Sequence, residues 1–341
     1  MVALTAGTAS AAGSGLQPLL DTTRVPGAAV AIVRDGTVDF LLGGVRSAAA
    51  PAPVTADTIF EAASLSKPVF AYAVLQLIDA GTLSLDTRLS TIVPDFVPDD
   101  ARATAITVRH VLSHTTGLPN WRSAEFPLRA YFSPGERFSY SGEGFVWLQK
   151  VAETAARQPI DQLMTDLVFQ PLGMGRSSFV WRPDLEENHA VPHDLQGSPG
   201  VKYKPAQMNA AASLQTTARD YARFVQAVLG AERLKPETAR LWLAPQSVLR
   251  HDCVQCLKGD EAPRDMRLAW GLGWGVAPDD GTFFHWGDNG RFKALIIGTP
   301  RDRAAFVVFT NGENGMALVP ALAQQLGATD HPLFGWLRYW R

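Results

Sequence analysis

A serine and a lysine three positions apart stand at the head of an apolar stretch of this sequence. Ser64 and Lys67 lie within residues 60–70, and residues three apart on a helix share one face. Residues 65–78 are apolar nearly throughout, which predicts a buried helix that begins at about Ser64. Burial lowers the pKa of a lysine because it disfavours the ammonium form. The pair therefore indicates a serine nucleophile beside a group that can accept its proton.

A Ser-x-x-Lys tetrad also occurs by chance, as a helix cap followed by a surface lysine, so its context decides its meaning. Residues 133–142 form a Pro-Gly turn that leads to Tyr140 at the start of a helix. Residues 284–288 place His285 at the end of a strand. Taken singly, Tyr140 could be a packed core phenol, His285 a cross-strand hydrogen-bonding group and Trp286 a core residue. Without a match to a known family, these structural interpretations would be preferred.

These three stretches resemble the motifs of the serine β-lactamase and penicillin-binding-protein superfamily. The resemblance is to its branch of class C β-lactamases, D-aminopeptidases, D-alanyl-D-alanine carboxypeptidases and related esterases. It extends over nearly the whole chain, through residues 106–118, 171–174, 217–220 and 310–312. It implies that an acyl-enzyme forms on Ser64, that Lys67 is the partner of this serine and that Tyr140 moves protons. It implies neither a metal nor an organic cofactor.

The resemblance also implies how the charged intermediate is held. The tetrahedral oxyanion needs preorganised donors, which in this superfamily would be the backbone N–H groups of Ser64 and Asp288. Gly287 would leave the strand edge open to substrate. A phenol, with an ordinary pKa of about 10, becomes a useful base only where a cation stabilises its phenolate. Lys67 could supply that charge to Tyr140.

Two positions depart from the motifs of β-lactamases. Gly142 stands where the second motif usually has asparagine, whose amide can bind a substrate's acyl amide. His285 replaces the lysine of the third motif, so a permanent cation becomes a group that titrates at about 6.5. Both changes weaken the case for a β-lactamase, and a His-x-Gly motif is familiar from D-peptidases and D-aminopeptidases. Arg291 and Lys293 either restore positive charge for a substrate carboxylate or are simply exposed.

We therefore expect a serine hydrolase that acts on small esters or amides, with weak β-lactam hydrolysis as a side activity. The small-molecule ester, amide or peptide would contact Ser64, Gly287 and Asp288, together with Trp286, Gly142 and Arg291. One alternative is a dedicated class C-like β-lactamase, D,D-peptidase or D-aminopeptidase. Another, outside the enzymes, is a catalytically silent binder of peptidoglycan peptides.

The histidines and cysteines give little support to a metal site. His110 and His114 lie four apart on a probable helix but lack the glutamate of a His-Glu-x-x-His motif, so a structural role is favoured. Cys253 and Cys256 have only His251 nearby, whereas zinc takes about four ligands. They form either a local disulfide, if the protein is exported, or two free thiols. We also expect Ser66 and Ser141 to contact the catalytic residues and hold them in place without contacting the substrate.

Composition excludes several classes of partner. The 341 residues are 46% apolar and 19% charged, which is typical of a globular chain with one large core or two unequal lobes. With 31 basic and 33 acidic side chains, the net charge of -2 indicates neither a nucleic-acid surface nor a polybasic membrane patch. No apolar run is long enough to span a bilayer.

The start of the chain and the superfamily resemblance bear on its location. Residues 1–15 make a poor signal peptide because they lack a basic segment and a long apolar core. They are either the remnant of a removed leader or an artificial extension. The resemblance favours a periplasmic or secreted protein, and a cytoplasmic one stays open. The oligomeric state is not predicted.

Strand patterns at both ends of the chain enclose a mostly helical middle. Residues 27–33 and 38–42 predict a hairpin with an Asp-Gly turn, and residues 272–276, 282–286, 294–298 and 305–310 predict further strands before a closing helix at 316–326. The pattern predicts an α+β fold whose antiparallel sheet of about five strands joins both termini and is flanked by helices. Residues 1–80 with 206–341 would carry Ser64, Lys67 and His285, and an inserted helical lobe, 81–205, would carry Tyr140.

Overall fold

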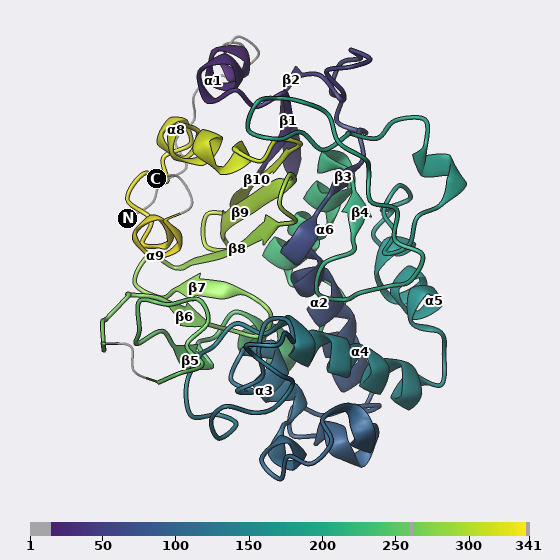
Figure 1. Cartoon of the computed structure of the whole chain (residues 1–341), viewed down its shortest axis with the longest axis vertical. Helices are drawn as coiled ribbons and strands as arrows, with labels where there is room; N and C mark the ends of the chain where they lie inside the picture. The colour runs from purple at the N-terminus through teal and green to yellow at the C-terminus, as the bar shows by residue number, and fades with distance from the viewer. Residues whose placement is uncertain (1–14, 260–261, 339–341) are drawn as a thin grey trace.

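The computed structural model describes residues 15–259 and 262–338, and an antiparallel sheet of eight strands runs through its centre (Figure 1). The expectations for residues 1–14 lie outside this described part. The strand order is β2-β1-β10-β9-β8-β7-β6-β5. The strands are β1 (Gly27–Arg34), β2 (Thr37–Gly44), β5 (Ser247–Val248), β6 (Ala269–Trp270), β7 (Gly275–Ala277), β8 (Thr282–Asp288), β9 (Lys293–Thr299) and β10 (Ala304–Thr310), while β3 (Phe60–Glu61) pairs separately with β4 (Gln215–Thr216).

The two ends of the described chain meet in the middle of the sheet. Strand β1 pairs antiparallel with β10, from Ala28 opposite Thr310 to Arg34 opposite Ala304. Strands β1 and β2 form the predicted hairpin, whose turn residues Asp35 and Gly36 both have positive φ, as a type I′ turn requires. The expectation that the sheet joins both termini is therefore confirmed.

Helices cover both faces of this sheet. The described α-helices are α1 (Leu16–Thr23), α2 (Ser66–Asp79), α3 (Val108–Leu112), α4 (Gly142–Ala156), α5 (Ile160–Met164), α6 (Ala218–Gly230), α7 (Pro236–Trp242), α8 (Val319–Gln325) and α9 (Leu333–Leu337). Alternate residues of β1 enter different cores: Ala29, Ala31 and Val33 pack with α2 and α6, whereas Ala28, Val30 and Ile32 pack with α1 and α8. Strand β1 is thus buried on both faces.

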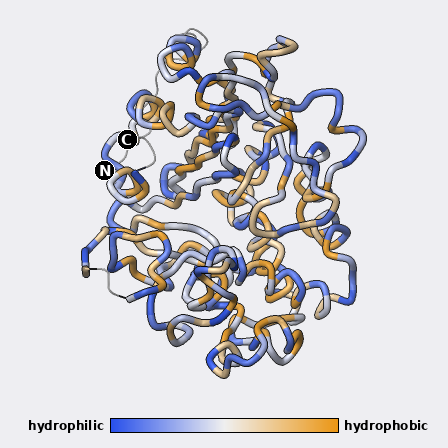
Figure 2. Tube along the Cα trace, in the orientation of Figure 1, coloured by the Kyte–Doolittle hydropathy of each residue, from blue (hydrophilic) through white to orange (hydrophobic). Residues whose placement is uncertain are grey.

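Helix α2 is the buried centre of the larger core. Every residue from Ser66 to Leu77 is buried, as the unbroken apolar pattern predicts. Figure 2 shows the same distribution along the chain, with hydrophobic positions gathered in the central strands and helices and hydrophilic ones in the outer loops. Among the described helices, none is both long and apolar enough to cross a membrane.

The α+β class is confirmed, but the expected number of strands, about five, is too low. Strands β5 and β6 have two residues each, too few to give an alternating pattern. The strand expected at 272–276 is instead the end of a turn, where Gly273 has a φ of 88° and donates its N–H to Leu112, followed by β7. The expected closing helix begins as a 3-10 turn at Gly315–Leu318 and continues as α8.

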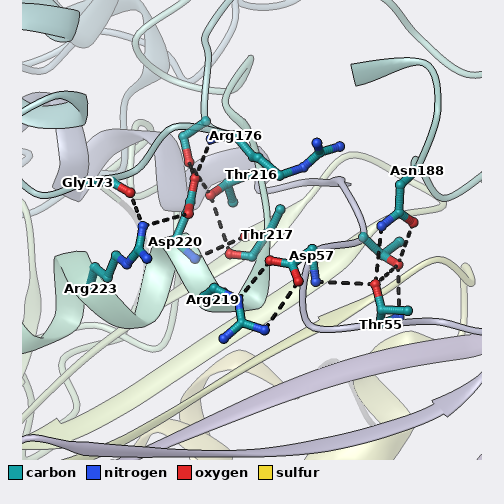
Figure 3. Close-up of polar contacts among 12 residues, drawn as sticks. Thr55, Asp57, Gly173, Arg176, Asn188, Thr216, Thr217, Arg219, Asp220 and Arg223 are labelled. Carbon is teal, nitrogen blue, oxygen red and sulfur yellow. Dashed lines mark hydrogen bonds and ion pairs between the residues drawn. The ribbon is translucent and has the colours of Figure 1, made fainter. Parts of the chain in front are cut away.

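A threonine caps the start of α6 (Figure 3). The Thr217 side chain accepts the backbone N–H of Asp220. The Asp220 carboxylate accepts the N–H of Arg176 and the hydroxyl of Ser177. It therefore ties α6 to a neighbouring loop. The division of the chain into two lobes stays a prediction, and α4 and α5 share the core of α2.

Candidate active site

Ser64 lies in a tight turn that precedes α2. The 3-10 turn Ala63–Leu65 leads into α2, which begins at Ser66 and not at Ser64 as expected. Ala63 has a φ of 49°, a left-handed conformation that is strained for a residue with a side chain. The Ser66 hydroxyl holds this turn by donating to the carbonyl of Ala63 (2.6 Å) and accepting the N–H of Leu214 (3.0 Å). Ser64 is partly exposed between buried neighbours, so its hydroxyl can be reached by a substrate.

Lys67 is fully buried directly behind that hydroxyl. Its Nζ donates to Ser64 Oγ (3.1 Å) and to the carbonyl oxygen of Ala211 (2.8 Å). Among the described residues, no carboxylate lies within ion-pair distance of this amine. Desolvation lowers the pKa of Lys67 well below its ordinary value, the direction expected from burial.

Tyr140 lies against this lysine at the entrance to α4. Its side chain is buried, and Lys67 Nζ stands 4.7 Å from the centre of its ring. The N–H of Tyr140 donates to the carbonyl of Val254 (2.9 Å), within the loop that the disulfide between Cys253 and Cys256 closes. Cys253 and Cys256 thus form a disulfide, and the loop that it closes accepts a hydrogen bond from the backbone of Tyr140. The structure thus brings Ser64, Lys67 and Tyr140 together.

His114 is a neighbour of Tyr140 that the sequence did not assign to the site. Its ring stacks on Tyr140 with 4.2 Å between centroids. Its Nδ1 accepts the backbone N–H of Ser141 (3.0 Å), so the proton of the neutral ring is on Nε2. Burial is the largest cause that lowers the pKa of His114 well below its ordinary value, with Lys67 adding to it. His114 thus supports Tyr140 as a neutral ring, a role that only the three-dimensional contact reveals.

His110 and Ser141, which the sequence suggested as a metal ligand and as a supporting group, cap helices. His110 Nδ1 accepts the N–H of Thr107 and caps α3. Ser141 caps α4 by accepting the N–H of Gly144 (3.0 Å), and it donates to the carbonyl of Pro119 (2.9 Å). Within residues 15–259 and 262–338, no group of three or more His, Cys, Asp or Glu side chains could hold a metal ion.

His285 lies on β8 beside Tyr140, but it does not titrate where we expected. It is fully buried, with 6.1 Å between the centres of the two rings. Its Nδ1 donates to the carbonyl of Trp286 (2.8 Å), so Nε2 carries the lone pair. Burial, followed by the charge of Lys67, lowers the pKa of His285 to about 3. The expectation of a titration at about 6.5 is therefore wrong, because a buried imidazolium beside a lysine is unfavourable.

The end of β8 forms an open edge against the Ser64 turn. Pairing of β7 with β8 stops at Phe284, whereas β9 pairs with β8 as far as Asp288. A side chain on Gly287 would collide with the carbonyl oxygen of Ala62, so this position needs glycine for the close approach. The backbone of β8 therefore runs directly beside the turn that carries Ser64. Trp286 lies on the same strand and packs 5.1 Å from the Tyr140 ring.

Of the two cations that follow this motif, Lys293 is held in an ion pair. Its Nζ donates to Asp288 Oδ1 (2.6 Å), and both side chains are partly buried. Arg291 lies directly against Gly200. The segment around Gly200 contains neither Ser64 nor Tyr140. Among the described residues, Arg291 makes no hydrogen bond or ion pair with Ser64, Lys67 or Tyr140. Its expected role in binding a carboxylate stays a prediction.

The space beside Gly142 is filled by a preceding loop. Its N–H donates to Asn120, with Oδ1 at 2.9 Å. A Cβ added to Gly142 would lie 2.8 Å from the Asn120 carbonyl oxygen and 2.8 Å from Trp121 Cη2. Asn120 and Trp121 thus occupy the room that the motif asparagine would need. The sequence did not single them out, although they follow the matching segment 106–118 closely.

An open pocket of about 370 Å³ lies beside β3 and the residue that follows β8. It is lined by Glu61, Tyr203, Asn209, Ala212, Ser213 and Asn289. Ala212 follows the residue whose carbonyl holds Lys67, and Glu61 stands three positions before Ser64. The pocket is therefore lined by residues next to the segments that hold Ser64 and Lys67.

Comparisons with known proteins identify the family of this chain. The model of the family described as Beta-lactamase matches residues 15–329. Penicillin-binding protein 4 of Amycolatopsis lactamdurans is 28% identical over 313 residues, which cover 84% of this chain and 81% of that protein. Protein flp of Staphylococcus aureus is 25% identical over 330 residues, 90% of this chain but only 63% of the relative. The solved structure of EstCE1, described as a hydrolase with promiscuous acyltransferase activity, superposes with a TM-score of 0.78 at 22% identity, covering 94% of this chain and 98% of that one.

Proposed function

The chain belongs to the beta-lactamase family of serine hydrolases, and on that basis we propose that it hydrolyses small uncharged esters or amides through an acyl-enzyme on Ser64. The observation that carries the proposal is the 3.1 Å contact between Ser64 Oγ and a buried Lys67 amine without a carboxylate partner. A neutral amine has a lone pair that can accept the serine proton. This is the activation that a serine nucleophile requires.

The proposed reaction has two halves. Ser64 Oγ attacks the substrate carbonyl and its proton passes to the Lys67–Tyr140 pair, while the N–H groups of Ser64 and Asp288 stabilise the oxyanion. The pair then protonates the leaving alcohol or amine as the tetrahedral intermediate collapses to the acyl-enzyme. In the second half, a water molecule gives its proton to the same pair and attacks the ester on Ser64. Collapse releases the acid and restores the hydroxyl of Ser64.

The charges around the site favour an uncharged substrate. His285 is neutral near physiological pH because its pKa is about 3. Lys293, which the sequence suggested as a replacement cation, forms an ion pair with Asp288. A carboxylate on the substrate would therefore lose its hydration without gaining a free cation from either group. Esters lacking that carboxylate avoid this penalty, which supports esterase activity over a dedicated β-lactamase.

A substrate panel tests this proposal. We expect kcat/KM for p-nitrophenyl butyrate to exceed that for nitrocefin or for D-alanine p-nitroanilide by at least about tenfold, equivalent to about 1.4 kcal/mol. A preference for nitrocefin would favour the β-lactamase alternative. A preference for the D-amino-acid anilide would favour the D-aminopeptidase alternative. Inertness towards all three, together with no labelling of Ser64 by a fluorophosphonate, would favour the non-catalytic peptide binder.

A further inference from the structure

A buried chain of polar contacts links the strand before Ser64 to the residue after Asp288. Glu61 lies on β3, three positions before Ser64, and its side chain is 5% exposed. Its Oε2 accepts a hydrogen bond from Asn289 Nδ2 (2.9 Å), and Asn289 follows Asp288 directly in the sequence. One side-chain contact therefore joins the two segments whose backbone N–H groups would hold the oxyanion.

The other oxygen of Glu61 is held by a second buried charge. Lys202 Nζ donates to Glu61 Oε1 (3.0 Å) and lies 4.4 Å from the centre of the Phe292 ring. Desolvation outweighs the attraction of Glu61 and lowers the pKa of Lys202 to about 8. A buried ion pair is weak evidence for stability, because desolvation offsets much of its attraction. Lys202 and Asn289 nevertheless hold one oxygen of Glu61 each, which fixes the carboxylate in one orientation.

Asn289 also reaches the segment that holds the catalytic lysine. Its Nδ2 donates to the carbonyl of Ala212 (3.3 Å), next to Ala211, whose carbonyl accepts from Lys67 Nζ (2.8 Å). The backbones on either side of this amide approach closely, since Gly287 leaves no space for a side chain against Ala62. A single amide nitrogen, from the residue that follows β8, thus bonds both the strand before the Ser64 turn and the segment at 211–212.

We propose that Glu61 and Asn289, with Lys202 orienting Glu61, are positioning residues that set the separation between the N–H groups of Ser64 and Asp288. This inference rests on the proposed acyl-enzyme function. Donors to an oxyanion act only when they lie about 2.7–3.1 Å from its position in the transition state. Loosening the link would therefore weaken binding of the tetrahedral intermediate more than binding of the planar substrate.

Asn289→Ala tests the link while leaving the pair of Glu61 and Lys202 in place. Asn289 is partly exposed, so the variant is expected to fold with a melting temperature close to that of the wild type. For p-nitrophenyl butyrate we expect kcat to fall about ten- to a hundredfold with KM within about twofold. The affinity for phenylboronic acid, which forms a tetrahedral adduct on serine, should fall by a similar factor.

A second variant separates the hydrogen bond from the charges. Glu61→Gln combined with Lys202→Met removes the ion pair but keeps an amide oxygen that can accept from Asn289. We expect kcat of this double variant to fall by a smaller factor than in Asn289→Ala, because the amide oxygen still accepts from Asn289 although Lys202 no longer orients it. Loss of kcat in the double variant as large as in Asn289→Ala would show that the charges, and not the link through Asn289, matter.

An ion pair on the neighbouring helix provides the control. Arg219 donates to Asp57 through Nε (2.8 Å) and one terminal nitrogen (3.2 Å), at the start of α6 (Figure 3). This pair anchors a loop without joining Ser64 to Asp288, so Arg219→Met should leave kcat and the boronate affinity unchanged. Equal losses in Arg219→Met and Asn289→Ala would contradict the proposal. So would an Asn289→Ala variant that changes only KM or nothing. Absence of ester turnover and boronate binding in the wild type would instead overturn the proposed function, and this inference with it.

Discussion

At the scale of single residues, Lys67 combines a catalytic advantage with a cost in stability. Its amine is buried without an acidic partner, so the pKa in the folded protein is lowered well below the value of about 10.4 found in unfolded chains. Between these two values the unfolded state binds more protons, so the stability of the folded protein rises with pH. Below the lowered pKa both states are protonated and the full penalty of a buried ammonium remains.

Replacing this lysine should therefore change stability in a pH-dependent way. We expect Lys67→Met to abolish measurable kcat. The difference in melting temperature, variant minus wild type, should be most positive at acidic pH and should shrink as pH rises towards about 10. Thermal unfolding at several pH values between 5 and 10 measures this trend. A difference that stays constant or grows with pH would show that Lys67 is charged in the folded protein.

For His285, unlike Lys67, we expect no pH-dependent effect: its titration should not appear in the kinetics. Its pKa is lowered to about 3 by burial and by Lys67, so the ring stays neutral from pH 5 to 8. His285→Asn keeps a polar side chain in the same place and should lower kcat/KM without moving any inflection of the pH profile in this range. An inflection at about 6.5 that is present in the wild type and absent from the variant would contradict this assignment.

At the scale of elements, the loop at Asn120 and Trp121 closes one side of the site. The loop leaves no space for an asparagine side chain at position 142, because a Cβ on Gly142 would meet Asn120 and Trp121 at 2.8 Å. We expect Gly142→Asn to lower stability by about 1–3 kcal/mol through overpacking and to leave nitrocefin hydrolysis no higher than in the wild type.

Gly175 provides a matched control for that substitution. A Cβ there would meet no atom within 4 Å, so Gly175→Asn should change stability by no more than about 0.5 kcal/mol. Chemical denaturation of both variants, with nitrocefin assays alongside, measures the contrast. Equal stability of the two variants would show that the loop moves aside easily, and a gain of nitrocefin activity in Gly142→Asn would show that its amide reaches the substrate.

Elements with a long, regular pattern could be predicted from the sequence, whereas short ones could not. The hairpin of β1 and β2 follows from alternating apolar residues around Asp35 and Gly36, and α2 follows from its continuous apolar run. Strands β5 and β6 depend on pairing partners supplied by the rest of the sheet, because two residues have no recognisable period. Helix α2 begins at Ser66 and not at Ser64, because Ala63, directly before Ser64, has a positive φ that no local pattern predicts.

At the scale of the whole molecule, the sheet brings together residues far apart in the chain. Ser64 and Lys67 are neighbours by spacing alone, and the motif resemblance suggested Tyr140 as their partner. His114 and Asn120 could not be found in this way, because their contacts with Tyr140 and Gly142 arise only when the loops fold against α4. The lowered pKa of His285 also depends on this packing, since burial is the largest cause of the shift.

The most direct test of the account is covalent labelling of Ser64. The wild type is incubated with a fluorophosphonate, its intact mass is measured, and the modified peptide is sequenced by mass spectrometry, with Ser64→Ala treated in parallel. We predict one phosphonyl group per chain on Ser64 and none on the variant, whose melting temperature should remain within a few degrees of the wild type. Labelling of Ser64→Ala to the same extent, or modification of the wild type at another serine such as Ser66 or Ser213, would contradict the central claim that Ser64 is the nucleophile.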